Sequence, residues 1–162
     1  MKVARCGVFI SRDILRGYIA RDIKMRSERI LIDARARQSG TAGSFVLALK
    51  PTFENIRRVR LVYADLPNPA SAPSGPYFNV RIAELGTGTR LAGTSRETSF
   101  IVPVNANVGE RCYYNEKSAF SQTMEFTPGL SLQSLSVTIT RNYGAAQLDR
   151  DDSILILEVE HE

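Results

Sequence analysis

The sequence contains one histidine, two cysteines and no tryptophan among its 162 residues. The histidine, His161, stands next to the last residue, and chain ends are commonly poorly ordered. A Ser-His-Asp or Cys-His mechanism needs a firmly held base, and most metal sites in enzymes need several histidines, carboxylates or cysteines close together. The sequence therefore predicts a protein that is not an enzyme, with no metal ion and no other cofactor.

The two cysteines, Cys6 and Cys112, are too few for a disulfide framework and are not spaced as a zinc site. We interpret them as reduced thiols.

Long hydrophobic runs are also missing, because no stretch approaches the roughly 18 apolar residues of a membrane-spanning helix. Charged residues interrupt the apolar ones near the N-terminus, unlike in a secretory signal peptide. Hydrophobic residues make up 43% of the chain, a usual share for a globular protein. We expect a soluble, unprocessed protein with one compact domain and an additional arm.

The charge is unevenly distributed along the chain. Residues 1–37 hold ten Lys or Arg and four acidic residues, whereas residues 38–162 hold eleven basic and thirteen acidic residues, for a total of +4. The excess of positive charge therefore belongs to the N-terminal segment. Such asymmetry is typical of an arm that contacts an acidic surface or a neighbouring subunit.

The N-terminal segment, residues 1–28, has the pattern of a short amphipathic helix or an arm. Ser11 is a suitable helix cap, and apolar residues then recur at helical spacing with basic residues between them. A basic amphipathic helix can bind a membrane surface, a nucleic acid or a partner, but most such helices pack on protein. We favour packing against the protein's own sandwich or a neighbour. The candidate contact residues are Arg5, Arg12, Ile14, Arg16, Tyr18, Ile19, Arg21 and Lys24.

Residues 29–162 form the second predicted unit, in which apolar residues alternate with polar ones as in half-buried β-strands. The predicted strands are 29–34, 44–49, 57–66, 77–83, 98–104, 119–126, 134–141 and 153–159. The last strand is an almost continuous apolar run, which is typical of a strand covered on both faces. Pro51 is expected to end one strand, Pro103 indicates an edge strand, and Pro128-Gly129 indicates a turn. Residues 105–117 are expected to form a loop.

Eight strands in a domain of this size predict an all-β fold, an eight-stranded jelly-roll sandwich with a basic N-terminal arm or short helix. Other sandwiches stay possible, because strand order cannot be read from one sequence.

Two further groups of charged residues have an ordinary explanation. Asp149, Asp151 and Asp152 lack the spacing of a calcium loop and suit a turn. Arg58 and Arg60 alternate with Val59 and Leu61, which predicts a solvent-facing side of a sheet; no row of exposed aromatics accompanies them, as nucleic-acid binding by stacking would need.

The stretch IDARAR at 32–37, the strand FVLAL at 45–49, the segment FENIRRVRL at 53–61 and Pro67-Asn68 resemble the opening of single jelly-roll capsid proteins of double-stranded DNA viruses. The closing pattern from Leu132 to Val159 is also similar to theirs. The resemblance covers roughly residues 30–68 and 128–160, and its motifs are structural, not catalytic. The basic lead of 28 residues and the short loops depart from the family's major capsid proteins.

The resemblance implies a virion structural protein, a minor capsid or vertex (penton) component that acts through contacts with other capsid proteins. It also implies a homo-oligomer, a pentamer or trimer, with no small-molecule substrate. The alternative is a receptor- or glycan-binding head domain that uses the loops 67–76, 86–96 and 105–117.

Overall fold

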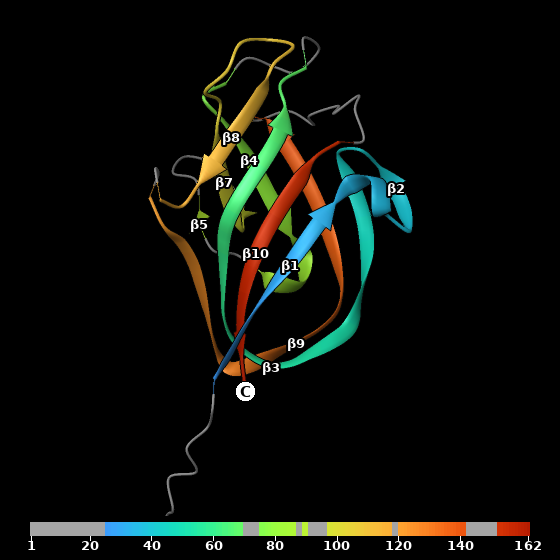
Figure 1. Ribbon diagram of the computed structural model, residues 1–162, viewed down its shortest axis with the longest axis vertical. Helices are drawn as coiled ribbons and strands as arrows, with labels where there is room; N and C mark the ends of the chain where they lie inside the picture. The colour runs from blue at the N-terminus through green and yellow to red at the C-terminus, as the bar shows by residue number, and fades with distance from the viewer. Residues whose placement is uncertain (1–24, 70–74, 87–88, 91–96, 118–119, 142–151) are drawn as a thin grey trace, which may run out of the picture.

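The computed structural model describes residues 25–69, 75–86, 89–90, 97–117, 120–141 and 152–162. Most of these residues lie in β-strands (Figure 1). The elements in chain order are β1 (Arg26–Asp33), η2 (Ala34–Ala36), β2 (Ser39–Thr41), β3 (Ser44–Pro67), β4 (Tyr77–Ile82), η3 (Ala83–Leu85), β5 (Thr89–Arg90), β6 (Glu97–Thr98), β7 (Phe100–Pro103), β8 (Arg111–Asn115), β9 (Gln122–Arg141) and β10 (Ile154–His161).

Two long strands, β3 and β9, connect the two layers of the molecule. They are 24 and 20 residues long and pair with each other in both layers. One layer contains β1, β10 and the C-terminal half of β3, beside which lie β8 and the start of β9. The other contains β2, the N-terminal half of β3, the C-terminal half of β9, β4 and β7. The prediction of an all-β sandwich is confirmed.

The bend that carries β3 and β9 from one layer to the other has a local cause. Register shifts interrupt their ladder between Ala48 and Arg58. Pro51 and Pro128 lie within these interruptions, where a missing backbone N–H breaks no ladder hydrogen bond. Asn55 has φ 52°, a left-handed conformation that Asn tolerates. A Cβ at Gly129 would lie 2.9 Å from the Asn55 Cα, so glycine lets the two strands approach.

The largest differences from the predicted division into strands are in three places. The predicted strands 44–49 and 57–66 are one strand, because Pro51 falls in a register break instead of ending the strand. The predicted strands 119–126 and 134–141 are also one, and Pro128-Gly129 is a bulge and not a turn. The predicted loop 105–117 contains β8, which pairs with the end of β3.

The first strand begins earlier than the predicted boundary at residue 29. Because β10 extends to His161, Arg26 has a backbone partner opposite it and belongs to β1. His161 is therefore held in a ladder, and the expectation that it lies on a frayed end is wrong. Its Nε2 lies 3.3 Å from Glu28 Oε1, and its ring packs edge-on against Phe53.

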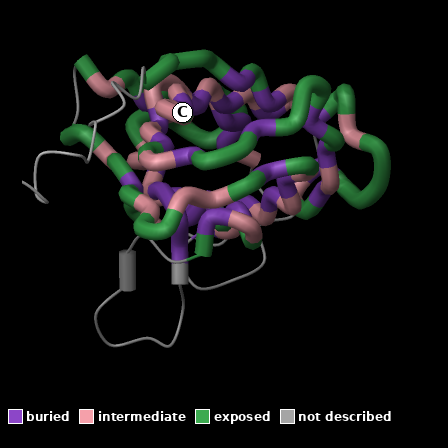
Figure 2. The backbone as a smooth tube through the Cα atoms, turned by 90° about the horizontal axis from the view of Figure 1, so that it is seen from below, coloured by how far each residue is buried: buried purple, intermediate pink, exposed green. Residues whose placement is uncertain are grey.

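The core lies between the two layers. Buried and less buried residues alternate along the strands, so buried segments line the inside of the molecule (Figure 2). β10 lies between β1 and β3, and its Leu155, Leu157 and Val159 are almost fully buried. The predicted central position of the last strand is confirmed, but the predicted covering of both its faces is not, because Ile154 and Ile156 are only partly buried.

Candidate assembly surface

The eight candidate contact residues, Arg5 to Lys24, lie outside the described residues. The structure begins at Met25, immediately before β1 at the edge of its layer, at the lower end of the molecule in Figure 1. The arm is therefore connected to the described molecule at Met25, and the surface next to Met25 is the part nearest to this connection.

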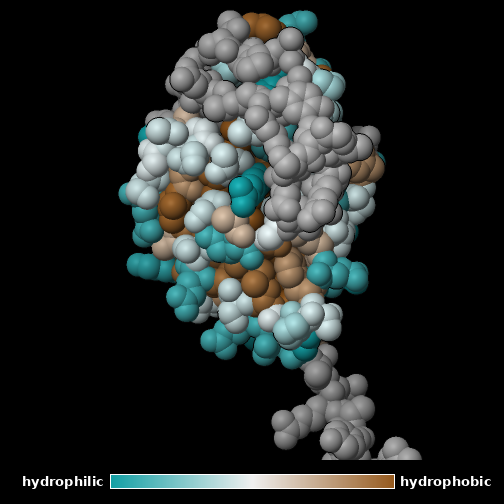
Figure 3. Space-filling model, turned by 180° about the vertical axis from the view of Figure 1, so that it is seen from behind, coloured by the Kyte–Doolittle hydropathy of each residue, from teal (hydrophilic) through white to brown (hydrophobic). Residues whose placement is uncertain are grey.

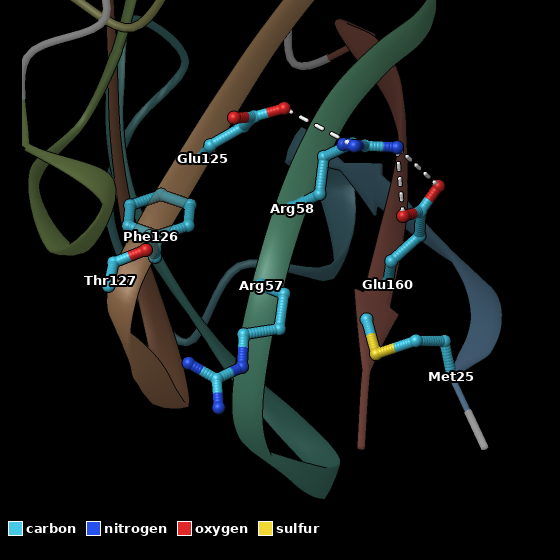
Figure 4. Close-up of a pocket in the computed structure, with 7 residues that line it drawn as sticks. All are labelled: Met25, Arg57, Arg58, Glu125, Phe126, Thr127 and Glu160. Carbon is cyan, nitrogen blue, oxygen red and sulfur yellow. Dashed lines mark hydrogen bonds and ion pairs between the residues drawn. The ribbon is translucent and has the colours of Figure 1, made fainter. Parts of the chain in front are cut away.

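A shallow hollow of about 320 Å³ lies beside Met25 on the outer face of the β1–β10–β3–β9 layer (Figure 4). Its lining residues come from all four strands or their ends: Met25, Arg57, Arg58, Glu125, Phe126, Thr127 and Glu160. Arg58 donates to Glu160 at 3.1 Å and to Glu125 at 3.2 Å, across β10 and β9. Glu125 is the more open partner, with 71% of its side chain exposed.

The ion pairs of the hollow continue along the same face as a ladder across the strands. Arg60 contacts Glu158 on β10 and Glu116 after β8. The hydrogen bond from Arg60 to Glu158 raises the pKa of the guanidinium above its ordinary value. Arg57 pairs with Glu162. The predicted solvent-facing position of Arg58 and Arg60, opposite the buried Val59 and Leu61, is confirmed. Each of these arginines has a carboxylate partner on a neighbouring strand or chain end.

The other half of this outer face is apolar. Leu31, Ile156 and Tyr63 stand opposite one another on β1, β10 and β3. Leu31 is 65% exposed, and Tyr113 on β8 is 47% exposed. Partial burial raises the pKa of the Tyr63 phenol. The face is thus divided into a charged half near Met25 and an apolar half near the end of β1.

At the far end of this layer, Arg111 joins three strands. Its guanidinium contacts the carboxylates of Asp65 on β3 and Asp152 before β10, and its Nη2 also donates to the Asp152 backbone oxygen at 2.7 Å. Burial works against its positive charge, but the hydrogen bond and charge of Asp65, with those of Asp152, outweigh burial and raise the pKa of Arg111. Asp152 is thus an ion-pair partner of Arg111, which fits its predicted structural role in a turn. Asp149 and Asp151 lie outside the described residues.

Compared with known proteins, the chain matches no family model and no curated protein. The surface must therefore be interpreted from its own geometry.

Within the described ranges, no three His, Cys, Asp or Glu side chains lie together as metal ligands would. The helical residues in those ranges are two single turns, η2 and η3, and neither is long enough to cross a membrane. Cys112 is a free thiol buried in the core. Cys6 lies outside the described part of the chain.

The opposite side of the molecule is of mixed character. Apolar surface appears between polar side chains in its lower half (Figure 3). In the layer that contains β4, Ser136 on β9 donates to Glu84 in η3 through its backbone N and its hydroxyl, each at 2.7 Å. Arg141, the last residue of β9, is 7% exposed, donates to Asn68 and stacks over the Phe78 ring at 5.6 Å.

Sequence reasoning missed three features of the outer face. The run Ile30-Leu31-Ile32 predicts a buried strand, so the exposure of Leu31 gives no local signal. The carboxylate partners Glu158 and Glu160 lie about 100 positions from Arg58 and Arg60, and only strand pairing brings them together. The exposed Tyr113 lies in a segment predicted to be a loop.

Proposed function

We propose that this protein is a structural subunit of a virion, a single jelly-roll minor capsid or vertex (penton) component. It acts through contacts between subunits and not by catalysis. Its partners are further copies of itself, as a pentamer or trimer, and other capsid proteins.

The pairing order supports the jelly-roll interpretation. The first strand, β1, pairs with the last, β10, which pairs with the second half of β3. The first half of β3 pairs with the second half of β9, and β4 and β7 follow. Two sets of about four strand segments, packed face to face, are typical of a double-sheet jelly roll.

The observation that carries the assembly role is the separation of charge between arm and body. Residues 1–24 hold six of the 21 Lys and Arg and two of the 17 Asp and Glu, which leaves fifteen of each sign on residues 25–162. The body is therefore formally neutral, and its outer-face arginines are paired with its own carboxylates. The body has no net negative charge that would attract the positive arm. The arm therefore suits a contact with another protein of the shell.

Removal of residues 1–24 tests the proposal. The cut stops before Met25 because β1 begins at Arg26. We expect the shortened protein to unfold in one cooperative transition, since the described core lies in residues 25–162, but to form neither a pentamer nor a trimer by light scattering. The full chain is expected to form a pentamer or trimer.

A matched pair of triple variants separates the arm's role from that of net charge. Arg12→Glu, Arg16→Glu and Arg21→Glu change the arm, whereas Lys50→Glu, Arg81→Glu and Lys117→Glu make the same change of charge at exposed body positions. The arm variant should lose assembly and the body variant should keep it. Equal behaviour of the two, or a ring that forms without residues 1–24, contradicts the proposal. Selective sugar binding on a glycan array would favour the head-domain alternative.

A further inference from the structure

The two edge strands of the sheet, β7 and β1, differ in how far their outer edges are covered. At one end, β7 has four residues, and the Gln122 side chain closes part of its edge: it accepts from the Ile101 N–H and donates to the Ile101 carbonyl, each at 2.6 Å. At the other end, β1 pairs with β10 in an unbroken register over all eight residues. Among the described residues nothing pairs with its outer edge. A long regular edge is a template for another strand.

The protection of this edge is incomplete. Natural edges are commonly shielded by proline, a bulge or charged side chains; β1, RSERILID, has no proline and no bulge, and its charged residues leave the central segment Ile30-Leu31-Ile32 without any. At its centre Leu31 is 65% exposed. Its outward neighbours on the same face are Arg29, two residues before it, and Asp33, two residues after it.

We infer that a second copy of this chain pairs with β1 through its own β1, antiparallel, about a two-fold axis at Leu31. In this register Leu31 lies opposite Leu31 of the second copy, and Arg29 lies opposite Asp33 of the second copy, twice. The contact is isologous, as in most symmetric dimers, and the partner is identified by complementary charge and by a shared apolar residue.

The neighbouring symmetric registers are worse. A two-fold axis at Arg29 places two guanidinium groups opposite each other, and like charges directly opposite destabilise a sheet. An axis at Ile30 places Arg29 opposite Leu31. An axis at Ile32 places Leu31 opposite Asp33. The axis at Leu31 alone matches apolar with apolar and basic with acidic.

The residues of β10 and β3 that lie beside β1 on the outer face fit the same register. Leu31, Ile156 and Tyr63 form an apolar row across three strands, and the axis joins it to the same row of the second copy. Arg29 is held loosely, 3.6 Å from Glu158 with 67% of its side chain exposed. It can therefore also donate to the carboxylate of the second copy's Asp33, which would share its oxygens between this Arg29 and its own Arg35.

Site-specific disulfide formation tests the register. Residues directly opposite in an antiparallel pair have Cα atoms about 4.5–5.5 Å apart, within the 4.4–6.8 Å that a disulfide needs. The two copies of residue 27 would be offset by eight positions, about 26 Å along the strand. In a Cys6→Ser background, with Cys112 left in the core, Leu31→Cys should give a covalent dimer of twice 18.0 kDa.

Ser27→Cys is the matched control, because Ser27 is exposed on the same strand, has no partner in the β1 of the second copy in this register, and random collision would link residues 27 and 31 alike. We expect at least ten times more dimer from Leu31→Cys. Equal yields, or no dimer from either variant, overturn the inference. A Leu31→Cys yield that rises only when residues 1–24 are removed also overturns it, because the arm would then be the occupant of the edge.

This inference rests on the proposed function and adds to it a two-fold contact that joins one pentamer or trimer to the next, since subunits within such a ring are not related by a two-fold axis. The two tests are separate. Loss of assembly on removal of the arm with no Leu31→Cys dimer leaves the proposed function standing and removes the β1 contact. A Leu31→Cys dimer together with unchanged assembly after removal of the arm supports the β1 contact and contradicts the proposed function.

Discussion

Asp33, the last residue of β1, is held by Arg35 two positions later. It accepts hydrogen bonds from the Arg35 backbone N at 2.9 Å, from Nε at 3.0 Å and from Nη2 at 2.7 Å. The side-chain hydrogen bond with Arg35 lowers the pKa of Asp33 below its usual value of 3.8. A lowered pKa in the folded state means that the charged form stabilises folding. This contribution is complete above pH 3.8 and is lost as the pH falls through the folded value.

Asp33→Asn should therefore lower stability by a small amount at pH 7, because exposed ion pairs contribute about 0–1 kcal/mol. Asparagine still caps η2, so the variant removes the charge and keeps the cap. The difference in unfolding free energy between the two proteins should shrink below pH 3.8. Carboxyl NMR titration and urea unfolding measure these quantities. A titration midpoint of Asp33 at or above 3.8 would contradict the assignment.

Among the elements, β7 depends on a side chain to complete its pairing. On one side it pairs with β4, and on the other the Gln122 amide bonds both backbone groups of Ile101. The amide thereby links the edges of the two layers where the curled sheet would otherwise stay open.

Gln122→Ala should destabilise the protein by about 1–3 kcal/mol, since it removes two hydrogen bonds worth roughly 0.5–1.5 kcal/mol each. The Ile101 amide should also exchange faster with solvent. Thr123→Ala, at the exposed next position, is the control and should change stability by less than about 0.5 kcal/mol. Urea unfolding and hydrogen exchange give the two readouts. Equal stability of the two variants would show that the bridge contributes nothing.

For the whole molecule, the position of β10 makes folding depend on the end of the chain. The last strand lies between the first strand and the second half of β3. Its inward residues Leu155, Leu157 and Val159 are at most 1% exposed. Truncation of a single buried leucine to alanine commonly costs about 2–5 kcal/mol, whereas a whole domain is stable by about 5–15 kcal/mol.

A chain that ends at Arg141 should therefore have no cooperative thermal transition by circular dichroism. Removal of residues 1–24, a segment of similar length, should leave the transition in place. A cooperative transition in the chain that ends at Arg141 would mean that the first layer forms without its central strand.

Local pattern determined the fold class and the orientation of many side chains. Alternation places Val59 and Leu61 inside and Arg58 and Arg60 outside, and the structure agrees. The almost continuous apolar run of 154–159 predicted a last strand inside the sheet, because such strands lack the polar positions that alternate in a half-buried strand. The candidate residues of the arm, Arg5 to Lys24, stay a prediction.

Only the tertiary structure decided which segments join and which faces are covered. Whether Pro51 ends a strand depends on the register of β9 opposite it, and the acidic partner of Arg58 lies on β10, 102 positions away. Leu31 has the same local sequence as a buried residue, yet it is exposed because no described strand covers the outer face of β1. Pairing across the sheet is a property of distant residues, and a local period cannot contain it.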